Sequence, residues 1–118
     1  MLMICTLNVR GAGKKVFDIL IYDLRRMFHF EVVTILEPRI SGSRASKVID
    51  GLDFPNNFIV EASGFSEGIW LLWDYTKVKL HVVAKTKYTI TAIVADGNKF
   101  WVLTVVYANP NAMLRRQL

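Results

Sequence analysis

Two polar residues with oxygen-bearing side chains stand at the ends of apolar runs. Asn8 lies near the end of the run that begins at residue 1, and Glu37 follows the run at residues 31–36. A helical pattern separates the two runs, which predicts that they pair as parallel strands. Their carboxyl ends would then lie side by side, where ligands bind in such sheets. A carboxylate there suits Mg²⁺, although taken alone each residue is more often the polar end of a strand.

The segment between the first strand and the helix, residues 10–15, combines two glycines with two lysines. Glycine-rich loops bind phosphate because backbone N–H groups are exposed at a helix N-terminus. The Walker A pattern fails here, since Asn8 occupies its first glycine position and Lys15 replaces its magnesium-binding hydroxyl. The segment is therefore predicted to be a tight turn with exposed basic side chains.

The other residues of catalytic type lack partner motifs. His29 and His81 are the only histidines and Cys5 is the only cysteine, so the sequence has no zinc cluster. Cys5 lies in an apolar run and is predicted to be a small strand residue, and a disulfide within the chain is excluded. The three tryptophans have the spacing of core residues in strands, which is favoured over base stacking.

The elements that must position these residues change in character along the chain. Apolar residues recur at helical spacing over residues 14–28, and a second helix is expected over residues 43–52 with Ser43 as its N-cap. Strand-like runs follow at residues 58–62, 69–73, 77–84, 88–95 and 99–107. Asp96-Gly97-Asn98 predicts a hairpin between the last two. This order predicts an α/β (α+β) fold with a mixed sheet, two helices and an antiparallel meander.

The composition suits one small domain or part of a larger one. Of 118 residues, 53% are hydrophobic and 21% are charged, which excludes a disordered chain. A net charge of +5 favours acidic partners such as nucleic acid, although the same charge also suits ordinary solubility. The sequence contains no run of roughly 18 apolar residues and no recognisable signal peptide. We therefore expect an intracellular protein of the nucleus or cytoplasm, without a membrane partner.

Four short segments, taken in order, resemble the endonuclease/exonuclease/phosphatase family. Residues 7–11 (LNVRG) resemble its W-N-x-R-G opening, and residues 36–42 (LEPRISG) look like its E-T-R segment. Residues 64–70 (GFSEGIW) are similar to its G-F-S-G-G-I-W strand entry, and residues 107–110 (YANP) to its Y-A-S-P turn, which a similar L-R-R segment follows. The order and spacing are most similar to the version found in plant LINE-type non-LTR retrotransposons.

The resemblance implies a four-layer α/β sandwich and Mg²⁺-dependent hydrolysis of nucleic-acid phosphodiesters. Residues 1–118 would be a single partial domain, the N-terminal half, truncated at its C-terminal side. By resemblance, Glu37 is the metal ligand, Asn8 positions the phosphate and the metal ligands, and Tyr107 contacts the phosphate. Arg10 and Arg39 are expected to touch the nucleic-acid backbone on grounds of charge.

The sequence also departs from the family pattern. Leu7 replaces a tryptophan, Pro38 follows the metal-binding glutamate, and Glu67 replaces a glycine. The family's Asp-x-Asn motif and Asp-His pair would lie beyond Leu118, so the general base has no candidate. We therefore expect a truncated or degenerate nuclease domain that is inactive as this chain alone, because a metal ligand without its base does not turn over efficiently.

Other interpretations remain open. The chain could be a piece of a longer active protein, or a remnant reading frame that does not fold cooperatively. It could instead be a non-catalytic nucleic-acid-binding or assembly module, whose binding would depend steeply on salt and not on metal. For the nucleic-acid hypotheses, DNA is expected in preference to RNA. An apolar sheet face without a partner sheet is expected to promote association between chains.

Overall fold

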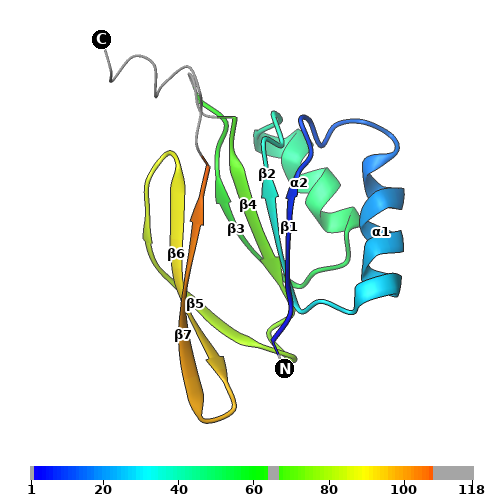
Figure 1. Ribbon diagram of the computed structural model, residues 1–118. Coiled ribbons are helices and arrows are strands. Elements are labelled where there is room, and N and C mark those ends of the chain that lie inside the picture. The colour runs from blue at the N-terminus through cyan, green and yellow to red at the C-terminus, as the bar shows by residue number, and fades with distance from the viewer. Residues whose placement is uncertain (1, 64–66, 108–118) are drawn as a thin grey trace.

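Two β-sheets pack face to face, and two helices cover the outer side of one of them (Figure 1). The computed structural model describes residues 2–63 and 67–107. The elements in chain order are β1 (Ile4–Asn8), α1 (Phe17–Phe28), β2 (Val32–Leu36), α2 (Gly42–Gly51), β3 (Asn56–Val60), β4 (Ile69–Trp73), β5 (Lys79–Lys85), β6 (Thr89–Asp96) and β7 (Lys99–Val106). This arrangement confirms the predicted mixed α+β class, with two helices and an antiparallel meander.

The first sheet is mixed, with the strand order β1-β2-β4-β3. β1 runs parallel to β2 with Asn8 opposite Leu36, as predicted from the helical crossover between them. β4 lies antiparallel to β2, with Ile69 opposite Leu36. The entry of β4 therefore lies beside the exits of β1 and β2, and the segments that flank these strands meet at one end of the sheet.

Apolar residues on both faces of the two central strands form two cores. One face of the first sheet packs against α1 and α2, with Ile35 and Trp70 fully buried. The other face packs against the second sheet, where Ile69 and Leu71 meet Ile90. β4 is buried along its whole length because it is covered on both sides, which explains its continuous apolar sequence. The result is three layers: helices, mixed sheet and antiparallel sheet (Figure 1).

The second sheet is the meander β5-β6-β7. Asp96 pairs with Lys99 across Gly97 and Asn98, so the predicted hairpin is confirmed. Gly97 has φ +61°, a conformation that glycine adopts without steric cost. A register shift between Val82 and Ala84 interrupts the pairing of β5 with β6.

Several predicted boundaries and faces were wrong. α1 begins at Phe17 rather than at residue 14, and of its apolar residues only Phe17 and Ile21 are buried. Val16 and Met27 are each 67% exposed, so the apolar face of this helix is narrower than its sequence suggests. Ser43 is not an N-cap, because α2 begins at Gly42 with Ser41 in the cap position. β3 spans Asn56–Val60, two residues earlier than the predicted strand at residues 58–62.

Much of the exposed apolar surface lies on a different face from the one expected. The inner faces of the two sheets share one buried core, and Trp101, which pairs with buried Val94, is 50% exposed at its edge. Other large exposed apolar residues lie on the outer face of the meander, and they include Ile93, Phe100, Val102 and Val106. Neither α1 nor α2, the helices of the described part of the chain, combines the length and apolar character needed to cross a membrane.

Candidate metal and phosphate site

The candidate site is built on backbone contacts at the end of the first sheet where β1 and β2 finish. Pairing continues beyond the strands, since Val9 N donates to Leu36 O at 3.0 Å and Gly11 N donates to Glu37 O at 2.7 Å. On the other side of β2, Glu37 N donates to Gly68 O at 3.3 Å. Arg39 N donates to Glu67 O at 3.0 Å. The loop that carries Glu37 is thereby fixed on both sides.

A cluster of two carboxylates and one guanidinium occupies this end of the sheet. Arg39 Nη2 lies 3.2 Å from Glu37 Oε1, and Arg39 Nε lies 3.1 Å from Glu67 Oε2. The Glu37 side chain is only 12% exposed, whereas the side chains of Glu67 and Arg39 are 34% and 44% exposed. Arg39 therefore bridges the two carboxylates from the solvent side.

Hydrogen bonds hold the Glu37 carboxylate in its charged form. Its pKa is lowered, chiefly by a hydrogen bond with the Glu67 carboxyl and further by hydrogen bonds from Asn8 and Arg39, while burial opposes the shift. The predicted meeting of Asn8 with Glu37 is thus observed. A contact between two carboxyl groups needs a proton or a cation to offset their repulsion.

Tyr107 reaches the same cluster from the end of the second sheet. Its backbone N donates to Tyr88 O at 2.8 Å, and its hydroxyl donates to Glu67 Oε2 at 3.4 Å. The residue is only 6% exposed. Burial, reinforced by the charge of Glu37, raises the pKa of Tyr107 to about 12. The phenol therefore remains a hydrogen-bond donor at neutral pH.

Three residues around the cluster adopt left-handed backbone conformations. The φ angles are +49° at Arg10, +58° at Glu37 and +60° at Arg39. Such conformations cost non-glycine residues roughly 1–2 kcal/mol each and persist only where the surroundings enforce them. Strain of this kind gathers at functional sites, so the three angles support the assignment of this end of the sheet.

A basic loop flanks the cluster. Arg10, Lys14 and Lys15 are exposed on the segment between β1 and α1. Arg44 from α2 lies over the same segment, because a Cβ on Gly13 would come within 2.6 Å of Arg44 Nη2. Of the two arginines expected to touch a nucleic-acid backbone, Arg10 is thus exposed beside the cluster, whereas Arg39 is engaged with the carboxylates.

The donor set at the cluster fits a hard divalent cation. Glu37 and Glu67 offer carboxylate oxygens, and Asn8 and Tyr107 add neutral oxygens nearby. Magnesium binds through one or two carboxylates and keeps several waters, so it does not require a complete protein cage. Within residues 2–63 and 67–107, no group of three or more His, Cys, Asp and Glu side chains offers a denser alternative.

Glu67 was not among the predicted site residues, although the sequence holds a signal for it. It stands two residues before β4, and β4 enters the sheet beside the exit of β2. A strand order that places β4 next to β2 brings the residues just before β4 close to Glu37. That order was not predicted, so Glu67 was recognised only as a departure from a family pattern.

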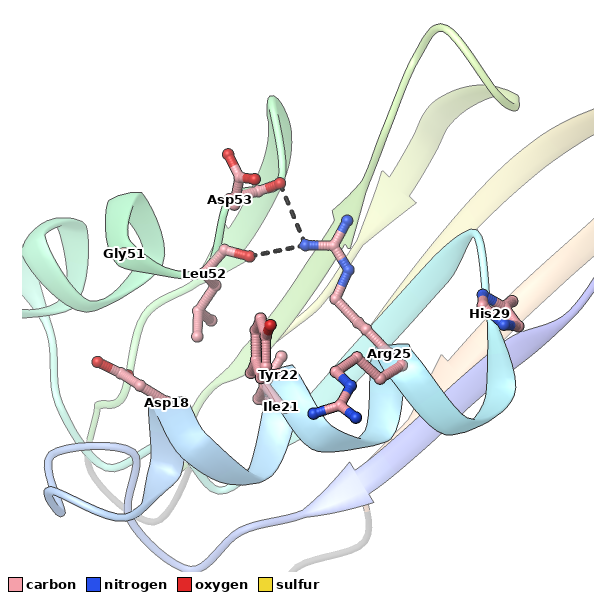
Figure 2. Close-up of a pocket in the computed structure, with 9 residues that line it drawn as sticks. Asp18, Ile21, Tyr22, Arg25, His29, Gly51, Leu52 and Asp53 are labelled. Atoms are coloured by element: carbon pink, nitrogen blue, oxygen red, sulfur yellow. Dashed lines mark hydrogen bonds between the residues drawn. The ribbon is translucent and has the colours of Figure 1, made fainter.

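Figure 2 shows a separate groove of about 340 Å³ between α1 and the segment that follows α2. Its lining holds none of the predicted site residues. Arg25 reaches across it and donates from Nη1 to Leu52 O at 3.0 Å and to Asp53 O at 3.3 Å (Figure 2). The same guanidinium lies 3.9 Å from the centre of the Phe54 ring. These contacts tie α1 to the start of β3 and explain the groove as a packing feature.

Comparison with known proteins finds a similar fold among solved structures. No protein-family model and no curated protein matches the sequence. Among solved structures, the endonuclease domain of TRAS1, a telomere-specific non-LTR retrotransposon, superposes with a TM-score of 0.59 at 10% sequence identity. The match covers 99% of this chain and 51% of that structure, so the chain spans about half of that structure's length. The chain therefore has a fold similar to part of a retrotransposon endonuclease domain.

Proposed function

We propose that this chain carries the metal- and phosphate-binding half of a nuclease site that acts on nucleic-acid phosphodiesters, with DNA preferred over RNA. The main support for this proposal is the cluster in which Asn8, Glu37 and Tyr107 meet at one end of the first sheet. The likeness of the fold to a retrotransposon endonuclease domain supports the reaction class. The specific link to plant LINE elements and the use of magnesium belong to this proposal.

Each residue of the cluster has a distinct role in the proposed site. Glu37 would hold Mg²⁺, because its carboxylate is nearly buried and its pKa is lowered. Asn8 orients that carboxylate through a hydrogen bond. Tyr107 keeps its proton at neutral pH and so can donate to a phosphate oxygen. When bound, Mg²⁺ supplies positive charge that offsets the charge of phosphoryl oxygens.

The described residues place no histidine at this cluster. His29 follows α1 at the far end of that helix, and His81 lies in β5 on the second sheet (Figure 1). A site that binds metal and phosphate without a general base holds its ligand but hydrolyses it slowly. We therefore expect this chain alone to bind DNA in the presence of Mg²⁺ with little or no cleavage.

The test is DNA binding by fluorescence anisotropy at fixed ionic strength, with Mg²⁺ and with EDTA, together with nicking of supercoiled plasmid. Binding should weaken in EDTA and in Glu37→Gln, and nicking should not exceed that of Glu37→Gln. Asp50→Asn is the matched control, because it changes charge equally on the exposed side of α2. Nicking that requires both Mg²⁺ and Glu37 would show that this chain already holds a working site.

A non-catalytic basic module is the second candidate, and the exposed basic residues Arg10, Lys14 and Lys15 favour it. It predicts DNA binding that is unchanged by EDTA or by Glu37→Gln and falls steeply with salt, because binding then rests on phosphate contacts that release counterions. That outcome would refute the metal site.

A further inference from the structure

The strongest unexplained feature of the cluster is the position of Arg39. Its guanidinium donates to Glu37 Oε1 from Nη2, to Glu67 Oε2 from Nε and, from Nη1, to the backbone oxygen of Arg10 at 3.4 Å. It thus lies between the Glu67 carboxylate and the Glu37 carboxylate, to which the proposed function assigns a cation. An arginine held in this way cannot also bind a phosphate through the same donors.

We propose that Glu67 is a second cation ligand and that Arg39 is a built-in competitor, which a divalent cation displaces from the two carboxylates. The proposal rests on the proposed function, since it assumes that Glu37 binds the metal. In the cation-free state Arg39 offsets the charge of the pair, and in the cation-bound state the metal does so. Metal binding would then release the guanidinium for a phosphate beside it.

The exposures of the three side chains support an exchange of this kind. Glu37 is the most buried and Arg39 the most exposed, so the arginine can swing into solvent while the carboxylates stay in place. Backbone hydrogen bonds from Glu37 N to Gly68 O and from Arg39 N to Glu67 O hold both carboxylate-bearing segments without any help from the guanidinium. The Tyr107 hydroxyl also orients Glu67 by donating to the oxygen that Arg39 Nε contacts.

A competing group and the ligand that it opposes lower each other's binding affinity by the same factor. Such couplings are typically about 5–150-fold. Arg39→Met keeps the length of the side chain and removes the guanidinium, so it should tighten cation binding by about tenfold or more. Glu67→Gln should weaken binding by a similar factor. Arg39→Lys keeps the charge but cannot bridge both carboxylates, so its affinity should lie between those of the natural chain and Arg39→Met.

The experiment is titration of each folded variant with Mn²⁺, following free Mn²⁺ by electron paramagnetic resonance. Circular dichroism verifies that each variant is folded. Arg10→Met is the matched control, because it removes one positive charge from the same end of the sheet without touching a carboxylate. If the proposal is correct, the affinity of Arg10→Met for Mn²⁺ stays within about twofold of that of the natural chain. A change of that size is well below the range typical of coupled sites. A second readout is the Arg39 Nε–H resonance, which should shift when Mg²⁺ is added.

The outcomes separate this inference from the proposed function. If Glu67→Gln binds Mn²⁺ like the natural chain while Glu37→Gln does not bind, Glu67 is no ligand and the inference fails, but the proposed metal site stands. If Arg10→Met gains as much affinity as Arg39→Met, the effect is one of general charge and the competition is refuted. If Glu37→Gln binds as tightly as the natural chain, both proposals fail.

Discussion

Replacing Trp70 with phenylalanine tests whether the free-energy cost of a buried, unpaired indole N–H is as large as the stabilisation that the larger indole ring provides. Trp70 is fully buried in β4, and its Nε1 has no hydrogen-bond partner among the described residues. An unsatisfied buried donor costs about 1–3 kcal/mol, which phenylalanine would recover. Against this, phenylalanine is smaller by about 40 Å³, and a cavity of that size costs about 1 kcal/mol at about 24 cal/mol per Å³.

The edge-on contact between Trp70 and Phe17, with ring centres 6.3 Å apart and an interplanar angle of 74°, would also weaken. Such a pair contributes about 0.5–1.5 kcal/mol. The gain and the two losses nearly cancel, so we expect Trp70→Phe to change the free energy of unfolding by less than about 1 kcal/mol. Trp70→Ala recovers the same donor cost but loses the whole side chain, and should cost about 3–5 kcal/mol.

Urea unfolding, monitored by far-ultraviolet circular dichroism, gives both changes in the free energy of unfolding. The comparison requires that the slope of this free energy against urea concentration is the same in all variants. Trp101→Phe is the control, because Trp101 is 50% exposed and its N–H can bond with water. A loss of more than about 3 kcal/mol for Trp70→Phe would contradict the reasoning, because it would exceed the cavity and aromatic costs together. It would mean that the indole N–H is satisfied in the native protein.

Two further predictions concern the candidate site. Gly68→Ala should lower the free energy of unfolding by about 1–3 kcal/mol in the same urea experiment, because φ is +92° and the new Cβ would lie 3.0 Å from Pro38 Cγ. Gly97→Ala, where φ is +61° and nothing lies within 4 Å, should lose less, and an equal loss would exclude crowding at Gly68. The raised pKa of Tyr107 means that its contribution to stability is present below pH 10 and is lost as pH rises towards 12. The difference in absorbance at 295 nm between the natural chain and Tyr107→Phe should therefore show an ionisation near 12, and one near 10 would contradict the buried phenol.

Local patterns in the sequence predicted most of the elements but not all of their ends. β4 lies at the predicted residues, because a run buried on both faces has a continuous apolar sequence. α1 begins three residues later than its apolar pattern, since residues 12–16 form turns in which Ala12 N donates to Pro38 O. That hydrogen bond joins segments far apart in sequence, so local spacing could not reveal it.

Apart from Tyr107, which entered through the family resemblance, the candidate site was predicted only where neighbouring elements determine it. The helical crossover between β1 and β2 fixes a parallel pair, and this pair places Asn8 beside Glu37. Glu67 depends on β4 lying between β2 and β3, and nothing in the strand pattern specified that order. The engagement of Arg39 by two carboxylates depends on side-chain geometry, and charge alone suggested only a phosphate contact.

The division of the cluster between two sheets has a consequence for folding. The meander β5-β6-β7 pairs strands that are adjacent in sequence, whereas the cluster joins the ends of β1 and β2 to Glu67 and Tyr107. Contacts between sequence neighbours form quickly, and contacts across long loops form later. A partly folded state that keeps the meander but opens β1 from β2 would therefore lack the proposed cation site. Some amides exchange only when the structure opens far enough to disrupt the cluster, and a bound cation would slow hydrogen exchange at these amides. Amides that exchange through smaller local openings would exchange at the same rate with or without the cation.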